Sequence, residues 1–160
     1  MREQILSILE ENSRIAVKEL ATRLAADELL VANELKAMEE EGIICGYHTI
    51  IDWEKTSIEK VTALIEVRIT PQRGQGFDNI AERIYKYPEV TACYLMSGGF
   101  DLMVFIEGKS LKDISMFVSQ KLSTLESILS TTTHFILMKY KDHGTILTQK
   151  YEDERMIMTP

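Results

Sequence analysis

The chain has 160 residues, of which 45% are hydrophobic and 27% charged, and its formal net charge is −7. This composition is typical of a globular protein, and the length suits one ordinary domain or two small ones. No apolar run approaches the roughly 18 residues that a membrane-spanning helix needs, and the acidic, amphipathic start MREQILSILEEN is unlike a signal peptide. We therefore expect a cytoplasmic protein with no membrane partner. Cys45 and Cys93 form neither a CxxC motif nor a disulfide framework.

The charge is unevenly distributed along the chain. Residues 1–50 hold five Lys or Arg and ten Asp or Glu, whereas residues 61–150 hold ten and nine. A surface that binds phosphates usually has a basic excess. The charge of residues 1–50 therefore argues against strong non-specific binding to DNA.

Residues 1–50 carry the apolar spacing of three short helices. The first is expected over 2–12 and the second around Val17–Leu24. Asp27 is a suitable N-cap for the third helix, and Gly42 is well placed to end it. Three short helices with brief connections predict a helix-turn-helix domain over 1–50. The polar stretch DWEKTSIEK then predicts a linker, placed at 51–60.

From residue 61 the apolar period changes to two, and strands alternate with helices. The expected order is a strand, a helix from Phe77, two strands joined through Gly98-Gly99, a helix near 110–122 and a last strand over 131–141. This βαββαβ order predicts a ferredoxin-like domain over 61–141, so the fold class is α+β with an N-terminal helix-turn-helix domain. Its helices cover one sheet face, and a second copy of the chain is the simplest cover for the other. Residues 142–160 are expected to be a polar tail.

Several sequence segments resemble one family. RIAVKELATRL and LKAMEEEGIICGY resemble the helix-turn-helix of the Lrp/AsnC (feast/famine) transcription regulators, including the GIIxGY exit. VRITPQRG and EVTACYLMSGGFDLMVFIEG resemble the effector-binding and oligomerisation (RAM) domain of that family. The resemblance covers about residues 4 to 141. It implies a homodimer built on the sheets, assembly to tetramers or octamers, amino-acid effectors bound between dimers, and double-stranded DNA read by paired helix-turn-helix units.

The third helix departs from the family pattern. The family usually has Ser or Thr with Pro at the start of this helix, arginines along it and a glycine in the turn before it. Here the helix positions carry acidic and apolar residues, and the turn position is Ala25. Asn33 and Lys36 are the candidates for reading base edges, beside Leu29 in the same helix. The candidate phosphate contacts are Arg14, Lys18 and Arg23. For each of these residues a solvated helix face is the alternative.

The Gly98-Gly99 hairpin is the candidate effector site. Without a Cβ, these glycines leave backbone N–H groups open to close approach by a carboxylate, and Asp101, next to Phe100, could pair with an α-ammonium group. By resemblance, the last strand lies opposite and brings His134, Phe135 and Ile136 nearby. The alternatives are a simple hairpin turn, a local cap by Asp101 and a packed strand position for His134.

The sequence lacks the usual signatures of an enzyme. The three histidines do not cluster with Cys or carboxylates at metal-ligand spacing, and GxGxxG, P-loop and GxSxG motifs are absent. We therefore expect no metal and no cofactor. A sirohaem decarboxylase lineage shares the architecture, but only Tyr47-His48 would support that reading. The prediction is a non-enzymatic, sequence-specific transcriptional regulator that responds to an amino acid or a related small molecule. The alternative is a metabolite-sensing oligomeric adaptor that does not bind DNA tightly.

Overall fold

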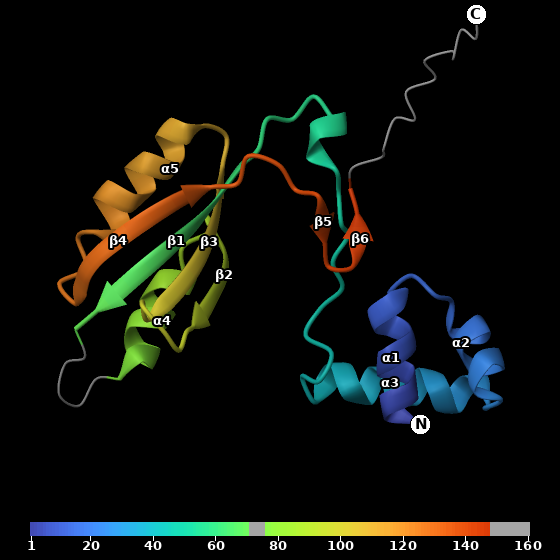
Figure 1. The fold of residues 1–160 in the computed structure, drawn as a ribbon. Coiled ribbons are helices and arrows are strands. Elements are labelled where there is room, and N and C mark those ends of the chain that lie inside the picture. Colours follow the sequence, from blue (N-terminus) through green and yellow to red (C-terminus); the bar gives the residue numbers. More distant parts are fainter. Residues whose placement is uncertain (71–75, 148–160) are drawn as a thin grey trace, which may run out of the picture. The chain divides into compact units, whose positions relative to one another are not determined.

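The structure, a computed structural model, describes residues 1–70 and 76–147. The chain divides into two compact units, Met1–Ile50 and Ile51–Pro160. Figure 1 draws the helices of the first unit in blue and the sheet of the second in green to orange. In the described part of the chain, no helix is both long enough and apolar enough to cross a membrane.

The first unit consists of the three predicted helices, α1 (Arg2–Glu11), α2 (Val17–Leu24) and α3 (Glu28–Glu40). Each helix is too short to be stable in water alone, so its stability comes from packing an apolar face. The buried side chains come from all three helices and form one small core of Ile5, Leu20, Ala21, Val31 and Met38.

Both predicted caps of α3 are confirmed. The Asp27 carboxylate accepts a hydrogen bond from the Leu30 N–H at 3.0 Å, as an N-cap does. At the other end Gly42 has a φ of +71°, and the Ile43 N–H donates to the Met38 carbonyl at 2.9 Å. This is a Schellman ending, which places a left-handed residue after the helix and favours glycine there.

The second unit has the predicted ferredoxin-like fold. Its strands are β1 (Val61–Ile69), β2 (Val90–Leu95), β3 (Leu102–Gly108) and β4 (Ile128–Phe135). They form an antiparallel sheet in the order β2-β3-β1-β4 (Figure 1). The helices α4 (Phe77–Tyr85) and α5 (Leu111–Phe117) pack against one face of this sheet, where alternate residues of β1 and β3 are buried with them.

Three boundaries in this unit differ from the sequence prediction. A six-residue loop, 96–101, replaces the two-residue turn, and the Met96 N–H closes it by donating to the Asp101 carbonyl at 2.8 Å. The last strand covers Ile128–Phe135 instead of 131–141, because a register shift after Arg68 lets Ile128 pair with Ile69. The helix expected to reach 122 is α-helical only to Phe117 and continues as a π-helical turn, η2 (Val118–Leu122).

The stretch predicted as a linker carries structure of its own. Residues Trp53–Lys55 form a 3₁₀ turn, η1, and this stretch clusters with the second unit. The start of the expected tail is likewise structured, because β5 (Lys141–Asp142) and β6 (Thr145–Ile146) form a short hairpin. The remainder of the predicted tail, 148–160, lies outside the described residues.

The sheet face opposite α4 and α5 is partly exposed. It carries the residues that alternate with the buried ones, including Leu64 and Glu66 on β1 and Met103 and Phe105 on β3. We name this face, together with Tyr94 of β2 and His134 of β4, the open sheet face. Tyr94 is 53% exposed and its ring meets that of Phe105 edge-on at 6.3 Å, so aromatic surface remains available to a partner.

Candidate DNA-binding and effector sites

The predicted DNA-contacting residues of α3 share one side of the helix. Leu29, Asn33, Lys36 and Glu40 follow one another at spacings of four, three and four residues, so they form a single stripe along α3. All four are exposed, Leu29 by 69%, while Val31 and Met38 are buried in the core. We call these four residues the exposed stripe of α3.

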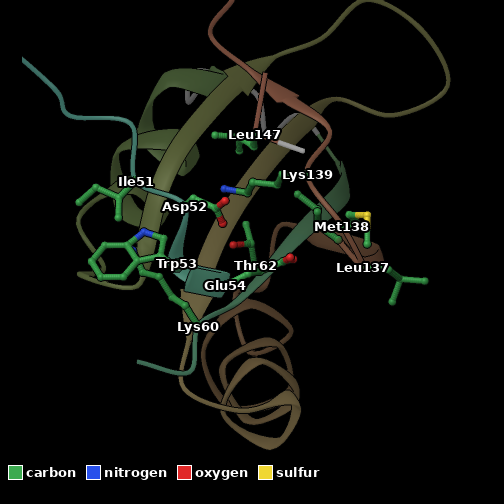
Figure 2. A pocket seen from close by; sticks show the side chains of 11 residues that line it. Ile51, Asp52, Trp53, Glu54, Lys60, Thr62, Leu137, Met138, Lys139 and Leu147 are labelled. Carbon is green, nitrogen blue, oxygen red and sulfur yellow. The ribbon is translucent and has the colours of Figure 1, made fainter. Parts of the chain in front are cut away.

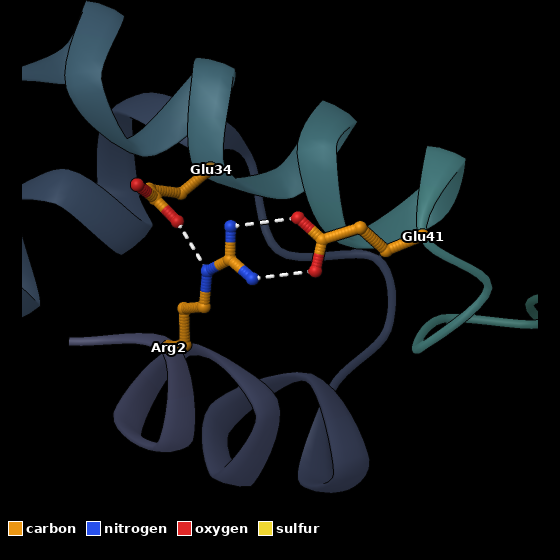
Figure 3. Close-up of polar contacts among 3 residues, drawn as sticks. All are labelled: Arg2, Glu34 and Glu41. Carbon is orange, nitrogen blue, oxygen red and sulfur yellow. Dashed lines mark hydrogen bonds and ion pairs between the residues drawn. The ribbon is translucent and has the colours of Figure 1, made fainter.

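Most acidic side chains of α3 lie away from this stripe. Arg2 of α1 binds Glu34 of α3 and Glu41, the residue that follows α3. Its Nε lies 2.6 Å from Glu34 Oε2, and its two terminal nitrogens lie 2.7 and 3.0 Å from the Glu41 carboxylate (Figure 3). Glu39 accepts a hydrogen bond of 2.8 Å from the Tyr47 hydroxyl. Within the stripe the one acid is Glu40, which lies 3.7 Å from the Lys36 ammonium.

These contacts change the protonation behaviour of the groups involved. The Arg2 hydrogen bond lowers the pKa of Glu41 below its ordinary value of 4.5. Desolvation, with the Glu39 hydrogen bond adding to it, raises the pKa of Tyr47 above its ordinary value of 10.0. At neutral pH the Glu41 carboxylate is therefore charged and paired, and Tyr47 remains a hydrogen-bond donor.

The three candidate phosphate contacts lie around α2. Arg14 is exposed in the turn before the helix, and Lys18 is exposed in its first turn. Neither side chain forms an ion pair with any residue that the structure describes. Arg23, in the last turn, is paired with Glu19 at 2.7 Å, with both side chains about half exposed. A contact of Arg23 with phosphate therefore competes with this exposed pair, which is weak in water.

The first half of the predicted effector site is the loop 96–101. Gly98 has a φ of +149°, and neither Gly98 nor Gly99 has an atom within 4 Å of where a Cβ would stand. Their backbone is open to an approaching group. One oxygen of Asp101, Oδ2, accepts a hydrogen bond from the Ile69 N–H at 2.7 Å, and the Asp101 N–H donates to the Val67 carbonyl at 3.0 Å. The loop is thus held at the C-terminal end of β1.

The second half of the predicted effector site lies beside the N-terminal half of β1. His134 pairs with Leu64 in the register of β1 and β4, and the Ile136 N–H donates to the Thr62 carbonyl at 3.0 Å. Leu64 and Ile69 are five positions apart on β1, about 16 Å of strand. The expectation that these groups lie near each other therefore fails within one chain, because β4 runs antiparallel to β1.

His134 and Phe135 also face opposite sides of the sheet. The His134 ring lies 3.2 Å from Glu66 Oε1 on the open sheet face, whereas Phe135 packs against the core between sheet and helices. Phe100 is half-buried in the loop 96–101. A pocket that uses both halves would need the loop of one chain and the strand of another.

The structure adds a pocket that the sequence did not predict (Figure 2). It encloses about 490 Å³, counting space open to solvent, between the segments 51–54 and 136–139. The Lys60 ammonium lies 4.6 Å from the centre of the Trp53 ring and 2.5 Å from Glu107 Oε2. Of the predicted effector residues, only Ile136 lines this pocket. The signal that could have pointed to it was the single tryptophan of the chain within a stretch read as linker.

The described residues contain no group of three or more His, Cys, Asp or Glu side chains placed to hold a metal ion. Burial raises the pKa of the Cys93 thiol above its ordinary value of 9.0, so at neutral pH it is a protonated packing residue. Cys45 is exposed, and its thiol donates to the Gly42 carbonyl at 3.1 Å.

Comparison with known proteins matches one domain within each of the two structural units. The profile of the Lrp/AsnC ligand binding domain matches residues 62–146, and that of a winged helix-turn-helix DNA-binding domain matches residues 1–44. The uncharacterized HTH-type transcriptional regulator YugG of Bacillus subtilis is 47% identical over 98% of this chain and 95% of its own length. The proline dehydrogenase transcriptional activator of Rhodobacter capsulatus is 30% identical over 82% of this chain and 84% of its own. These relatives are named as regulators of transcription, not as enzymes.

Solved structures agree with the fold. The transcriptional regulator NMB0573 of Neisseria meningitidis, in complex with L-Met, is 26% identical, with a TM-score of 0.69 over 88% of this chain and 90% of that one. AsnC of E. coli is 21% identical, with a TM-score of 0.68 over 92% and 96%. From the matched domains and these relatives, the chain belongs to the Lrp/AsnC family of helix-turn-helix transcriptional regulators.

Proposed function

We propose that this chain regulates transcription by placing the exposed stripe of α3 in the major groove of its operator, with an amino acid or a related small molecule controlling the binding. The observation that carries the proposal is the composition of the stripe. Although α3 is acidic, its stripe presents Leu29, Asn33 and Lys36, and its one acid, Glu40, lies beside Lys36.

Each side chain of the stripe has a defined chemistry toward DNA. The Asn33 amide can bond two atoms of an adenine edge, Lys36 can donate to guanine, and Leu29 can contact a thymine methyl group. Arg14, Lys18 and Arg23 would bind phosphates of the DNA backbone. Such contacts fix the position of the domain on the duplex without reading its sequence. We assign base recognition to Asn33 and Lys36.

The acidic charge of residues 1–50 limits the affinity of one domain. Ten acidic residues against five basic ones weaken the attraction to phosphates. Two or more helix-turn-helix units bound at once would supply the missing affinity. Once the first unit is bound, it holds the second at a high effective concentration near the DNA. The open sheet face, with Tyr94, Met103 and Phe105, is the surface we assign to the homodimer. Larger assemblies, tetramers or octamers, would be built from such dimers.

We place the effector at the loop 96–101. The open backbone at Gly98 and Gly99 can donate to a carboxylate, and Asp101 keeps one carboxylate oxygen, Oδ1, for an α-ammonium group. The L-Met complex of NMB0573 supports an amino acid as the ligand class. His134 to Ile136 would belong to the same pocket only as a contribution from a neighbouring chain, since they lie about 16 Å along the sheet from this loop.

The experiment is fluorescence anisotropy of the purified protein on fragments of its own promoter region. It is run at low and moderate salt, with and without single amino acids, beside an Asn33→Ala variant and a shuffled fragment. We expect selective binding that one amino acid shifts and that Asn33→Ala makes less selective. Binding to no fragment at any salt, with the oligomer intact by light scattering, would overturn the proposal in favour of a metabolite-sensing adaptor. The acidic charge of residues 1–50 is the observation that favours that second function.

A further inference from the structure

Arg2 is the feature of the first unit that the DNA-binding role does not yet explain. It stands at the start of α1, yet its guanidinium reaches α3 and bonds two carboxylates there (Figure 3). Glu34 and Glu41 are 27% and 48% exposed and Arg2 40%, so the cluster lies at the surface and not in the core. Exposed ion pairs contribute little to folding. A role in stability alone therefore does not account for three charge-assisted bonds to one side chain.

The geometry fixes where the two carboxylates lie. Glu34 and Glu41 are seven residues apart, which is about two turns, so they line up along one side of α3. The exposed stripe, which starts at Leu29 and recurs every three or four residues, lies on a different side of α3. Arg2 donates through Nε to Glu34 and through both terminal nitrogens to Glu41, a bidentate arrangement that lysine cannot copy.

The excess of acidic over basic residues in residues 1–50 makes the pairing of Glu34 and Glu41 with Arg2 matter for DNA binding. Residues 1–50 hold five basic side chains. Arg23 and Lys36 pair with an acid of their own helix, whereas Arg2 bonds two carboxylates outside its own helix. Two free carboxylates on α3 would lie within about one helix diameter, roughly 10 Å, of any phosphate that the helix approaches. At that distance their repulsion is felt at low salt and screened at high salt, since the Debye length at 0.1 M is about 10 Å.

We propose that Arg2 is a positioning residue for DNA binding, which holds Glu34 and Glu41 on the α1 side of α3 and offsets their charge, so that an acidic recognition helix can approach phosphate. This inference rests on the proposed function. The lowered pKa of Glu41, caused first by the Arg2 hydrogen bond, agrees with a carboxylate that stays ionised and paired at every pH at which DNA binding would be measured.

The test compares the DNA affinity of wild type with that of Arg2→Gln, across a salt series, on the fragment that wild type binds best. We expect Arg2→Gln to weaken binding about fivefold near 50 mM salt and less than about twofold near 300 mM. Arg83→Gln, which removes the same charge from an exposed position on α4 in the second unit, is the matched control and should leave affinity unchanged.

Rescue separates the electrostatic role from a structural one. Adding Glu34→Gln and Glu41→Gln to Arg2→Gln removes two negative charges for the one positive charge already lost, so the triple variant should bind at least as tightly as wild type. Arg2→Lys keeps the charge but loses the bidentate bond to Glu41, so its affinity should lie between those of Arg2→Gln and wild type. Circular dichroism on heating shows that each variant is folded.

Each outcome decides between the two proposals. If wild type binds no DNA, the proposed function fails, and the role of Arg2 falls with it. If wild type binds and Arg2→Gln binds equally well at low salt, only the role of Arg2 is overturned. A triple variant that stays as weak as Arg2→Gln also overturns it, because Arg2 would then brace the helices or touch DNA itself.

Discussion

Asp101 Oδ2 lies 2.7 Å from the backbone nitrogen of Ile69, and this hydrogen bond joins residues 32 positions apart. Ile69 is only 4% exposed, so water is a poor substitute for the carboxylate at this N–H. The same side chain that we assign to the effector therefore also holds the loop 96–101 against β1. Any test of its role in binding has to separate these two functions.

Two substitutions at Asp101 separate them. Asp101→Ala leaves the Ile69 N–H without its acceptor and should lower the free energy of unfolding by about 1–3 kcal/mol. Asp101→Asn keeps an acceptor oxygen but loses the charge, so it should stay within about 1 kcal/mol of wild type and bind an amino acid more weakly. Urea unfolding and titration calorimetry measure the two effects. Unchanged ligand affinity in Asp101→Asn would remove Asp101 from the effector site.

The turn between α2 and α3 contains a strained alanine. Ala25 has a φ of +50°, and the Ala26 N–H donates to the Ala21 carbonyl at 3.0 Å across it. A residue with a Cβ costs about 1–2 kcal/mol in this left-handed conformation, whereas glycine adopts it freely. We expect Ala25→Gly to raise the free energy of unfolding by about 0.5–1 kcal/mol, measured by thermal unfolding.

The neighbouring alanine is the control for this prediction. Ala26→Gly changes the same atoms at a position without positive φ, where the added chain entropy is the main effect, so it should destabilise the protein. If Ala25→Gly and Ala26→Gly destabilise equally, the strain assigned to Ala25 is absent.

An ion pair between Glu89 and Lys121 gives the second unit a dependence on pH. The hydrogen bond from Lys121 lowers the pKa of Glu89 below its ordinary value of 4.5, and the Lys121 ammonium also lies 5.2 Å from the centre of the Tyr87 ring. Since the folded-state pKa is the lower one, the stabilisation is present above pH 4.5 and is lost as pH falls through the folded-state pKa.

Glu89→Gln should therefore lower the urea midpoint at pH 7 and have little effect at a pH low enough to protonate Glu89 in the folded protein. Glu126→Gln, at an exposed position, is the control and should change neither midpoint. A Glu89→Gln effect that is the same at both pH values would mean that the contribution is packing and not charge.

The open sheet face should control the oligomeric state. Phe105→Glu places a charge in the middle of this face, where burial against a second copy would leave it unpaired. Because Phe105 is only partly buried, we expect the variant to fold and to sediment as a smaller species than wild type. Lys112→Glu, exposed on α5, makes a larger charge change away from this face and should leave the sedimentation coefficient unchanged.

The order of helices and strands was determined by the sequence itself, because apolar periods of 3.6 and 2 are local properties. The caps of α3 were predictable for the same reason, since Asp27 and Gly42 act on backbone groups a few residues away. The family resemblance added the expected effector loop and DNA-reading helix. Strand ends were less predictable, because the start of β4 depends on a register shift against β1.

Partners distant in the chain were decided only by the tertiary structure. The sequence placed acids along α3 but could not say that Arg2, 32 positions before Glu34, would hold two of them away from the stripe with Asn33. Nor could it reveal that the antiparallel register places Asp101 beside Ile69 and His134 beside Leu64, five positions apart on β1. Helical spacing fixes which side chains share a face, but the side chain that meets them from another element depends on how the elements pack.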